Sequence, residues 1–157
     1  MLFRSPLHAK KIDRALLLMD DLPGIQVSGN LIEGSNDGET DLGITVIDED
    51  LVTGNVSTDN QGSSLTGINR ISSNLSINSP SRIGDALKIN VLKTDGVEYE
   101  RVGYSLPAGF NGWRVGAHAS TLKYKVISQK FESLNPYGTA VTTGLDVTYP
   151  KIGRAHV

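Results

Sequence analysis

The spacing of apolar residues divides this chain into two parts. Between residues 10 and 21, apolar side chains recur at the helical spacing i, i+3, i+4 and i+7; this face carries Ile12, Ala15, Leu16 and Met19. Beyond about residue 51 the helical spacing disappears, and apolar residues alternate with polar ones at the period of two that is typical of strands. The pattern predicts a short amphipathic helix followed by a β-rich remainder.

Two strands and a turn complete the predicted first part. Pro23-Gly24 stops the helix, and the alternation over residues 24–32 predicts a strand. Residues 33–39 are rich in Gly, Asn and Asp and predict a turn, after which a second strand covers residues 42–46. This α+β unit ends at the acidic run 48–50 and is too short to close a core of its own.

Six strands are predicted in the second part, separated by segments rich in Gly, Pro, Asn, Asp and Ser. Their windows are residues 52–57, 70–77, 87–91, 101–106, 113–120 and 141–149. The segments between them show no helical pattern, so neighbouring strands are expected to pair antiparallel as a meander.

Alternate positions within these windows form two sets of opposite character. One set, which includes Ile71, Val91 and Leu145, is almost wholly apolar, and the other contains only polar residues and glycine. The polar set holds the candidate functional residues Arg70, Lys88, Arg101, Arg114, His118 and Asp146. A soluble sandwich would pack the apolar face against a second sheet, whereas an outer-membrane barrel would present it to lipid and line a wet lumen with the polar face. Periodicity alone leaves both arrangements open.

The cations decide which face would meet lipid if lipid is present. Turning any one of them outward near the membrane midplane would cost about 2–4 kcal/mol. The four concerned are Arg70, Lys88, Arg101 and Arg114. In a barrel these residues are therefore expected to line the lumen.

Two weaker features also favour a barrel. Tyr104, Trp113 and Tyr149 fall on the apolar set beside short turns, as interfacial aromatics would, although ordinary strand aromatics are the alternative. The link 107–112 is also shorter than the stretch 121–140, as expected for short turns on one side and longer loops on the other. Leu122 and Tyr124 interrupt the predicted alternation within that longer stretch.

Composition narrows the function classes only slightly. The chain has 157 residues, a formal net charge of -2 and no cysteine, so neither a basic nucleic-acid surface nor a disulfide framework is expected. Its longest apolar run, residues 15–19, is far shorter than the roughly 18–20 residues of a transmembrane helix. A membrane protein is therefore compatible with this sequence only as a barrel.

The two ends of the chain match one DNA string read in opposite directions. ATC GGA AGA GCA CAC GTC encodes residues 152–157, and the reverse strand, read as GTG CTC TTC CGA TCT from a GTG start, encodes residues 1–5. We expect both ends to derive from sequencing-adapter DNA; a coincidence of codon choice is the alternative. These residues are left out of the fold prediction, and the native protein is expected to continue beyond both ends.

No catalytic, metal or cofactor site is predicted. His118, Ser120 and Asp146 share the polar set, but no nucleophile-elbow spacing supports a triad. The acidic run 48–50 does not match a Ca²⁺ loop and is interpreted as a solvated charge cluster.

An ordered series of short motifs resembles a known family. The series comprises residues 14–25 (RALLLMDDLPGI), residues 54–62 with Asp59-Asn60-Gln61-Gly62, Thr66-Gly67, Gly84-Asp85-Ala86-Leu87, residues 104–112 beginning Tyr104-Ser105-Leu106-Pro107, and residues 147–150. It is similar to the two-partner secretion transporters, the haemolysin-activator and haemagglutinin-transporter proteins often called TpsB. The similarity runs from about Ile12 to Pro150.

The resemblance implies an architecture and a localisation. Residues 6–50 would be the C-terminal part of the second POTRA domain, lying in the periplasm, and residues 51–151 the first strands of a transmembrane β-barrel in the outer membrane of a Gram-negative bacterium. Its partners would be the lipid bilayer and a secreted TpsA-like exoprotein of haemolysin, haemagglutinin or adhesin type. No ATP, cofactor or nucleic acid is implied.

The sequence therefore supports a leading hypothesis and two alternatives. The first is a passive export pore whose basic lumen residues contact the unfolded exoprotein in transit or merely keep the lumen hydrated. A soluble or cell-surface β-rich binding module of adhesin type is the second. The third is an outer-membrane-protein assembly factor of the same architecture, which would carry more POTRA domains.

Overall fold

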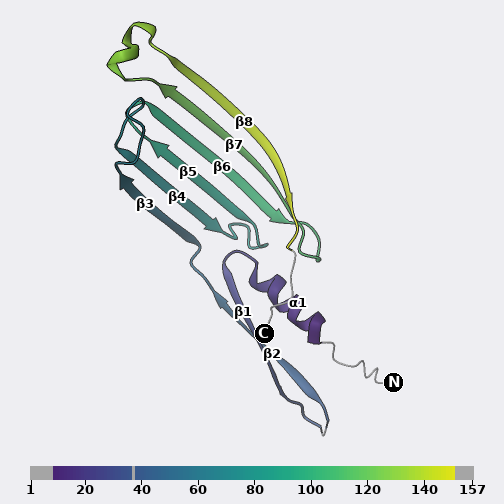
Figure 1. Cartoon of the computed structure of the whole chain (residues 1–157). Helices are drawn as coiled ribbons and strands as arrows, with labels where there is room; N and C mark the ends of the chain where they lie inside the picture. The colour runs from purple at the N-terminus through teal and green to yellow at the C-terminus, as the bar shows by residue number, and fades with distance from the viewer. Residues whose placement is uncertain (1–8, 37, 151–157) are drawn as a thin grey trace. The chain divides into compact units, whose positions relative to one another are not determined.

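The computed structural model describes residues 9–36 and 38–150, and these are mainly β (Figure 1). Internal contacts divide the described residues into one unit, up to Glu49 together with Pro150, and a second unit, residues 50–149. The predicted adapter-derived ends, 1–5 and 152–157, lie outside the described residues.

The first unit is a helix packed on a two-stranded hairpin. Its elements are α1 (Ala9–Asp20), β1 (Ile25–Glu33) and β2 (Thr40–Asp48). These elements confirm the predicted helix and strands. Leu16 of α1 lies over Gly29 of β1, where a Cβ would collide with the leucine side chain. The Asp20 carboxylate accepts a hydrogen bond from the Val27 amide at 2.8 Å and joins the end of α1 to β1.

One face of this hairpin is apolar and only partly covered. The antiparallel register places Val27 opposite Val46, and Leu31 opposite Leu42. Val27 is buried, but Leu31 and Val46 remain 60% and 56% exposed. The helix therefore covers only part of the apolar surface that the two strands present.

The second unit is a single six-stranded antiparallel sheet in which each strand pairs with its neighbours in sequence (Figure 1). Its strands are β3 (Val52–Asp59), β4 (Arg70–Asn78), β5 (Ala86–Lys93), β6 (Val97–Pro107), β7 (Arg114–Lys125) and β8 (Tyr137–Thr148). A short 3-10 helix, η1 (Gln129–Leu134), lies between β7 and β8. The predicted meander is confirmed, and β3 and β8 each pair on one side only among the described strands.

The prediction was wrong about the long stretch 121–140. Strand β7 continues to Lys125 and β8 begins at Tyr137, so the connection is only residues 126–136. Leu122 and Tyr124 do not interrupt the pleat, because they lie opposite Ala140 and Gly138 with the alternation intact. What changes here is the polarity of the two faces. A prediction that assigns every apolar residue to the same face therefore stops before the observed ends of β7 and β8.

That change of polarity is visible in one cross-strand row. Lys93 lies opposite Glu98, and Glu98 lies opposite Lys123, at positions that continue the apolar face. The two lysines reach Glu98 at 3.4 Å and 3.8 Å. The apolar face of the sheet thus ends in a charged row near the β5–β6 turn.

The rest of the apolar face, between this charged row and the other end of the sheet, is exposed. Ile71 is 53% exposed and Leu145 is 86% exposed. On β7 the apolar positions are exposed, while the polar positions Gly116, His118 and Ser120 between them are half-buried. Within the described residues the only buried hydrophobic side chains are Val27 and Ala86, so this sheet has no protein layer over its apolar side.

The loops at the charged end of the sheet are hydrogen-bonded to one another. The Thr66 carbonyl, in the β3–β4 loop, accepts bonds from Gly96 N and Thr94 Oγ1, each at 2.6 Å. Gly96 O accepts a bond from Lys125 N at 2.7 Å, and Leu65 O accepts one from Ile127 N at 2.8 Å. Three connections that are distant in sequence therefore form one cluster.

Gly96→Ala in the full-length protein should loosen this cluster. A Cβ at Gly96 would collide with the carbonyl oxygens of Lys125 and Thr66, which are backbone atoms and cannot rotate away. Overpacking of this kind costs about 1–3 kcal/mol. The measurement is the guanidinium midpoint of unfolding in detergent.

The matched control is Gly103→Ala, in the same sheet, where the nearest atom to a Cβ is 3.6 Å away. Equal midpoints for the two variants would contradict the proposed role of the loop cluster.

Candidate functional site

The polar face of the six-stranded sheet carries the candidate functional residues. Cross-strand pairing aligns Asn55, Asn74, Asn90 and Arg101 in one row across β3 to β6. The Asn90 amide nitrogen donates to Asn74 Oδ1 at 2.7 Å, and the Asn74 amide nitrogen donates to Asn55 Oδ1 at 3.3 Å. These bonds form an amide ladder that fixes the side chains in the middle of the face.

All six predicted polar residues occupy this face, but the structure divides the four cations into two kinds. They are Arg70 on β4, Lys88 on β5, Arg101 on β6, both Arg114 and His118 on β7, and Asp146 on β8. Arg70 donates hydrogen bonds from Nε and Nη2 to the Asp59 carboxylate, and the shortest of these contacts is 2.9 Å. Arg114 donates to Gly84 O at 2.9 Å and to Ser105 Oγ at 3.2 Å. Both of these arginines are held by the protein itself.

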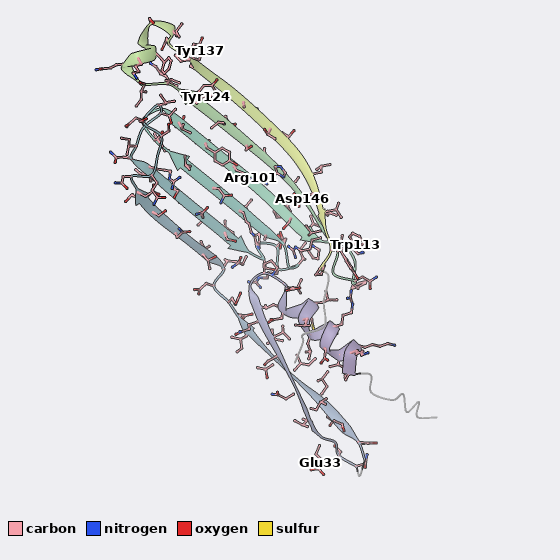
Figure 2. The ribbon with its side chains drawn as sticks, in the orientation of Figure 1. Glu33, Arg101, Trp113, Tyr124, Tyr137 and Asp146 are labelled. Carbon is pink, nitrogen blue, oxygen red and sulfur yellow. The ribbon has the colours of Figure 1, made fainter. Side chains whose placement is uncertain are left out.

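The other two cations have no such partners. Among the described residues, neither Lys88 nor Arg101 makes a hydrogen bond or an ion pair through its side chain. Both line a shallow hollow of about 590 Å³ on the polar face, together with Asn74, His118 and Asp146. In Figure 2, Arg101 and Asp146 are labelled on the same sheet. The hollow therefore brings two cations without a side-chain partner in the described structure to a solvent-open part of this face.

His118 and Asp146 form a pair that depends on glycine. His118 Nδ1 lies 3.4 Å from Asp146 Oδ1, with 20% and 49% of the side chains exposed. The His118 ring lies over Gly144 and the Asp146 carboxylate over Gly116, and a Cβ at either glycine would collide with them. The contact is an ion pair only when His118 is protonated. No hydrogen bond joins His118 to Ser120, so the described residues do not assemble the arrangement of a hydrolytic triad.

Metal and membrane-helix features are absent from the part of the chain that the structure describes. No three His, Cys, Asp or Glu residues in it are grouped so that they could hold a metal ion. No helix in it has the length and hydropathy needed to cross a membrane.

A buried carboxylate organises the β4–β5 turn, and sequence reasoning missed it. Asp85 is fully buried and accepts bonds from Tyr104 Oη at 2.6 Å and from Ser81 N at 3.2 Å and 3.3 Å. Ser79 and Arg82 of the same turn adopt positive φ of 51° and 58°, a conformation disfavoured for residues with a Cβ. The hydrogen bonds to Asp85 hold this turn closed. The only signal in the sequence was the Gly-Asp motif, since periodicity carries no information about turn carboxylates.

The pKa of Asp85 lies below its usual range. Burial opposes ionisation and acts to raise this pKa, but the hydrogen bonds that the carboxylate accepts from Tyr104 and Ser81 outweigh burial. The hydrogen bonds of the turn therefore stabilise the ionised form of Asp85.

The three predicted aromatics lie toward the same end of the sheet. Trp113 and Tyr149 flank the first residue of β7 and the last of β8, and their ring centroids are 4.7 Å apart at 40°. Tyr104 continues the apolar alternation of β6 but directs its hydroxyl to Asp85. Each side chain remains about 37–46% exposed. This arrangement combines an exposed ring with a hydrogen-bonded polar tip at Tyr104.

These features define a class of protein: a β-rich chain with an antiparallel meander, one exposed apolar face and one hydrogen-bonded polar face. The family described as haemolysin secretion/activation protein ShlB/FhaC/HecB matches residues 38–150, and the chain belongs to this family. The resemblance inferred from the short motifs, to two-partner secretion transporters, is thereby confirmed.

Individual relatives carry a transporter name. The heme/hemopexin transporter protein HuxB of Haemophilus influenzae strain 86-028NP is 29% identical over 144 residues, which are 90% of this chain and 25% of the relative. HuxB of strain ATCC 51907 / DSM 11121 / KW20 / Rd is 28% identical over the same length, with the same coverage of both chains. The chain thus spans about a quarter of the length of the curated relatives it matches. No solved structure matches it.

Asp85→Asn in the full-length protein should lower stability at neutral pH. A carboxyl whose pKa is depressed on folding adds stability that is present above its unfolded pKa of about 3.9 and is lost as the pH falls through the folded pKa. The gap between parent and variant should therefore be widest at pH 7 and shrink below about pH 4. Urea midpoints in detergent at both pH values measure it.

Asp95→Asn serves as the control, because Asp95 is an exposed turn residue with no side-chain hydrogen bond in the described structure. A gap for Asp85→Asn that is independent of pH would rule out the stabilising role of its charge.

Proposed function

We propose that the full-length protein is an outer-membrane pore that exports a large partner protein by two-partner secretion. Residues 51–151 would be the opening strands of its β-barrel. Residues 6–50 would be the end of the second POTRA domain in the periplasm. Family membership supports the transport class, since the family is described by haemolysin secretion and the relatives are named transporters.

The observation that carries this proposal is the exposed apolar face of the six-stranded sheet. A soluble protein rarely exposes a contiguous apolar patch of more than a few hundred Å². Here the aliphatic side chains of that face range from 36% to 86% exposed at Val91, Leu75, Ile71, Val141 and Leu145. Lipid would cover this face without a second sheet, and the four inner strands already satisfy their backbone groups by pairing with their neighbours.

The polar face fits a wet lumen. Asn, Ser and Thr side chains line it, several of them in hydrogen-bonded cross-strand pairs such as Ser57 with Ser72 at 2.7 Å. Such a wall would keep an extended polypeptide hydrated while presenting few apolar surfaces to which it could adhere. Transport would need no ATP, because folding of the partner outside the cell would make movement one-way.

The partner is proposed to be a TpsA-like secreted exoprotein. The family description points to a haemolysin-type protein, while the relatives' name points to a protein concerned with heme and hemopexin.

The proposal is tested by extraction and by conductance of the full-length protein. It should require detergent, shift its electrophoretic mobility on boiling and form channels in planar bilayers. Recovery in the aqueous fraction without detergent would favour the soluble adhesin-type module. A requirement for the protein in the insertion of other barrels, without loss of any exported protein, would favour an assembly factor.

Leu145→Arg should impair membrane assembly, whereas Thr142→Arg should not. The two positions lie on opposite faces of β8: Leu145 is opposite Ala117 on the apolar face and Thr142 is opposite Ser120 on the polar face. An arginine facing lipid near the midplane costs about 2–4 kcal/mol, and one facing water costs little. The folding free energy of each variant in phospholipid vesicles measures the difference. An equal loss for both would mean that the apolar face does not meet lipid.

A further inference from the structure

The two unpartnered cations of the polar face lie on neighbouring strands and are diagonal neighbours. Lys88 of β5 is directly opposite Gly103 of β6, and Arg101 lies two residues before that glycine, opposite Asn90. Gly103 places no side chain between the two charged residues. A Cβ there would meet only His118 Cβ at 3.6 Å and Ala117 O at 3.9 Å. Lys88 and Arg101 therefore lie beside a glycine that lines the hollow.

Only one acidic side chain, Asp146, shares the hollow with these two cations. The strand register places only two acids on the polar face of the described sheet, Asp59 and Asp146. Asp59 Oδ2 lies 2.9 Å from Arg70 Nη2 in an ion pair, and Asp146 Oδ1 lies 3.4 Å from His118 Nδ1. The other acids in these strands, Glu98 and Glu100, fall on the opposite face. Two cations therefore face one carboxylate in the hollow, and positive charge remains in excess.

The neighbouring amides strengthen that conclusion. The Asn90 and Asn74 amide nitrogens are already committed to the ladder, so these side chains are oriented by one another. They offer a rigid polar floor rather than a counter-charge. Lys88 is exposed and Arg101 is half-buried, so both can reach a group in the hollow.

We propose that Lys88 and Arg101 form an anion-binding subsite that receives side-chain carboxylates of the exported polypeptide as it passes. This inference rests on the proposed export function and deepens it, because it assigns a chemical class to the contacted groups. The guanidinium of Arg101 can hold a carboxylate with two hydrogen bonds, and the ammonium of Lys88 acts as a point charge beside it. Charged contacts in a wet site are weak, so each carboxylate would be released as readily as it is captured.

The same geometry excludes an equal role for the other two cations. Arg70 would have to leave Asp59, and Arg114 would have to leave Gly84 and Ser105, before either could bind a passing anion. The subsite is therefore limited to one diagonal pair.

The test uses the full-length protein in planar bilayers, with an oligoglutamate peptide as the probe and oligoglutamine of equal length as its uncharged counterpart. Lys88→Gln/Arg101→Gln should raise the concentration of oligoglutamate that half-blocks the current by about tenfold, with no change for oligoglutamine. Lys93→Gln/Lys123→Gln removes the same charge from the opposite face and should leave the block unchanged. The charge-conserving Lys88→Arg/Arg101→Lys should behave as the parent does.

The outcomes separate the inference from the function. An unchanged oligoglutamate block in the Lys88→Gln/Arg101→Gln channel would overturn the subsite while leaving the pore in place. A shift in chloride selectivity without a change in peptide block would overturn the assignment to polypeptide carboxylates. Absence of any channel from the parent protein would overturn the proposed function and the subsite with it.

Discussion

The structure depends on how the apolar side of one antiparallel sheet is covered. Each inner strand of β3 to β8 satisfies its backbone groups through two neighbours, so the sheet needs no further hydrogen bonds except at its two edges. The apolar side chains of the sheet are not covered in the same way, since Leu145 and Ile71 project from one face and no described residue packs over them. Burial of apolar surface is the main stabilising term in folding, so this face requires either lipid or a second protein layer.

The two ends of the apolar face are chemically marked. At the end with the loop cluster, Lys93, Glu98 and Lys123 replace aliphatic residues, and both lysines pair with Glu98. Toward the opposite end, Trp113 and Tyr149 pack together. A band of aliphatic side chains bounded by charge at one edge and aromatic rings toward the other is the distribution expected where a hydrocarbon layer is flanked by polar interfaces.

The sequence predicted what depends on periodicity and missed what depends on register. Alternation of apolar and polar residues identified all six strands, but it ended β7 early and began β8 late, because Leu122 and Tyr124 follow the reversed polarity beyond the apolar band. The pairing of Arg70 with Asp59 arises only when the two residues are brought opposite each other on β4 and β3. Sequence therefore nominated the basic residues but could not distinguish those already paired from those left free.

The covering of the apolar face is tested most directly along β8. Spin labels on single cysteines can be placed at Val141, Leu145, Thr142 and Asp146 in the full-length protein in phospholipid vesicles, once any cysteine outside the 157 residues has been replaced by serine. The account predicts that oxygen, which is lipid-soluble, increases the relaxation rate of labels at Val141 and Leu145. A water-soluble nickel complex should instead increase the relaxation rate of labels at Thr142 and Asp146. Labels at Val141 and Leu145 that are shielded from both reagents, as in a dry protein core, would contradict it.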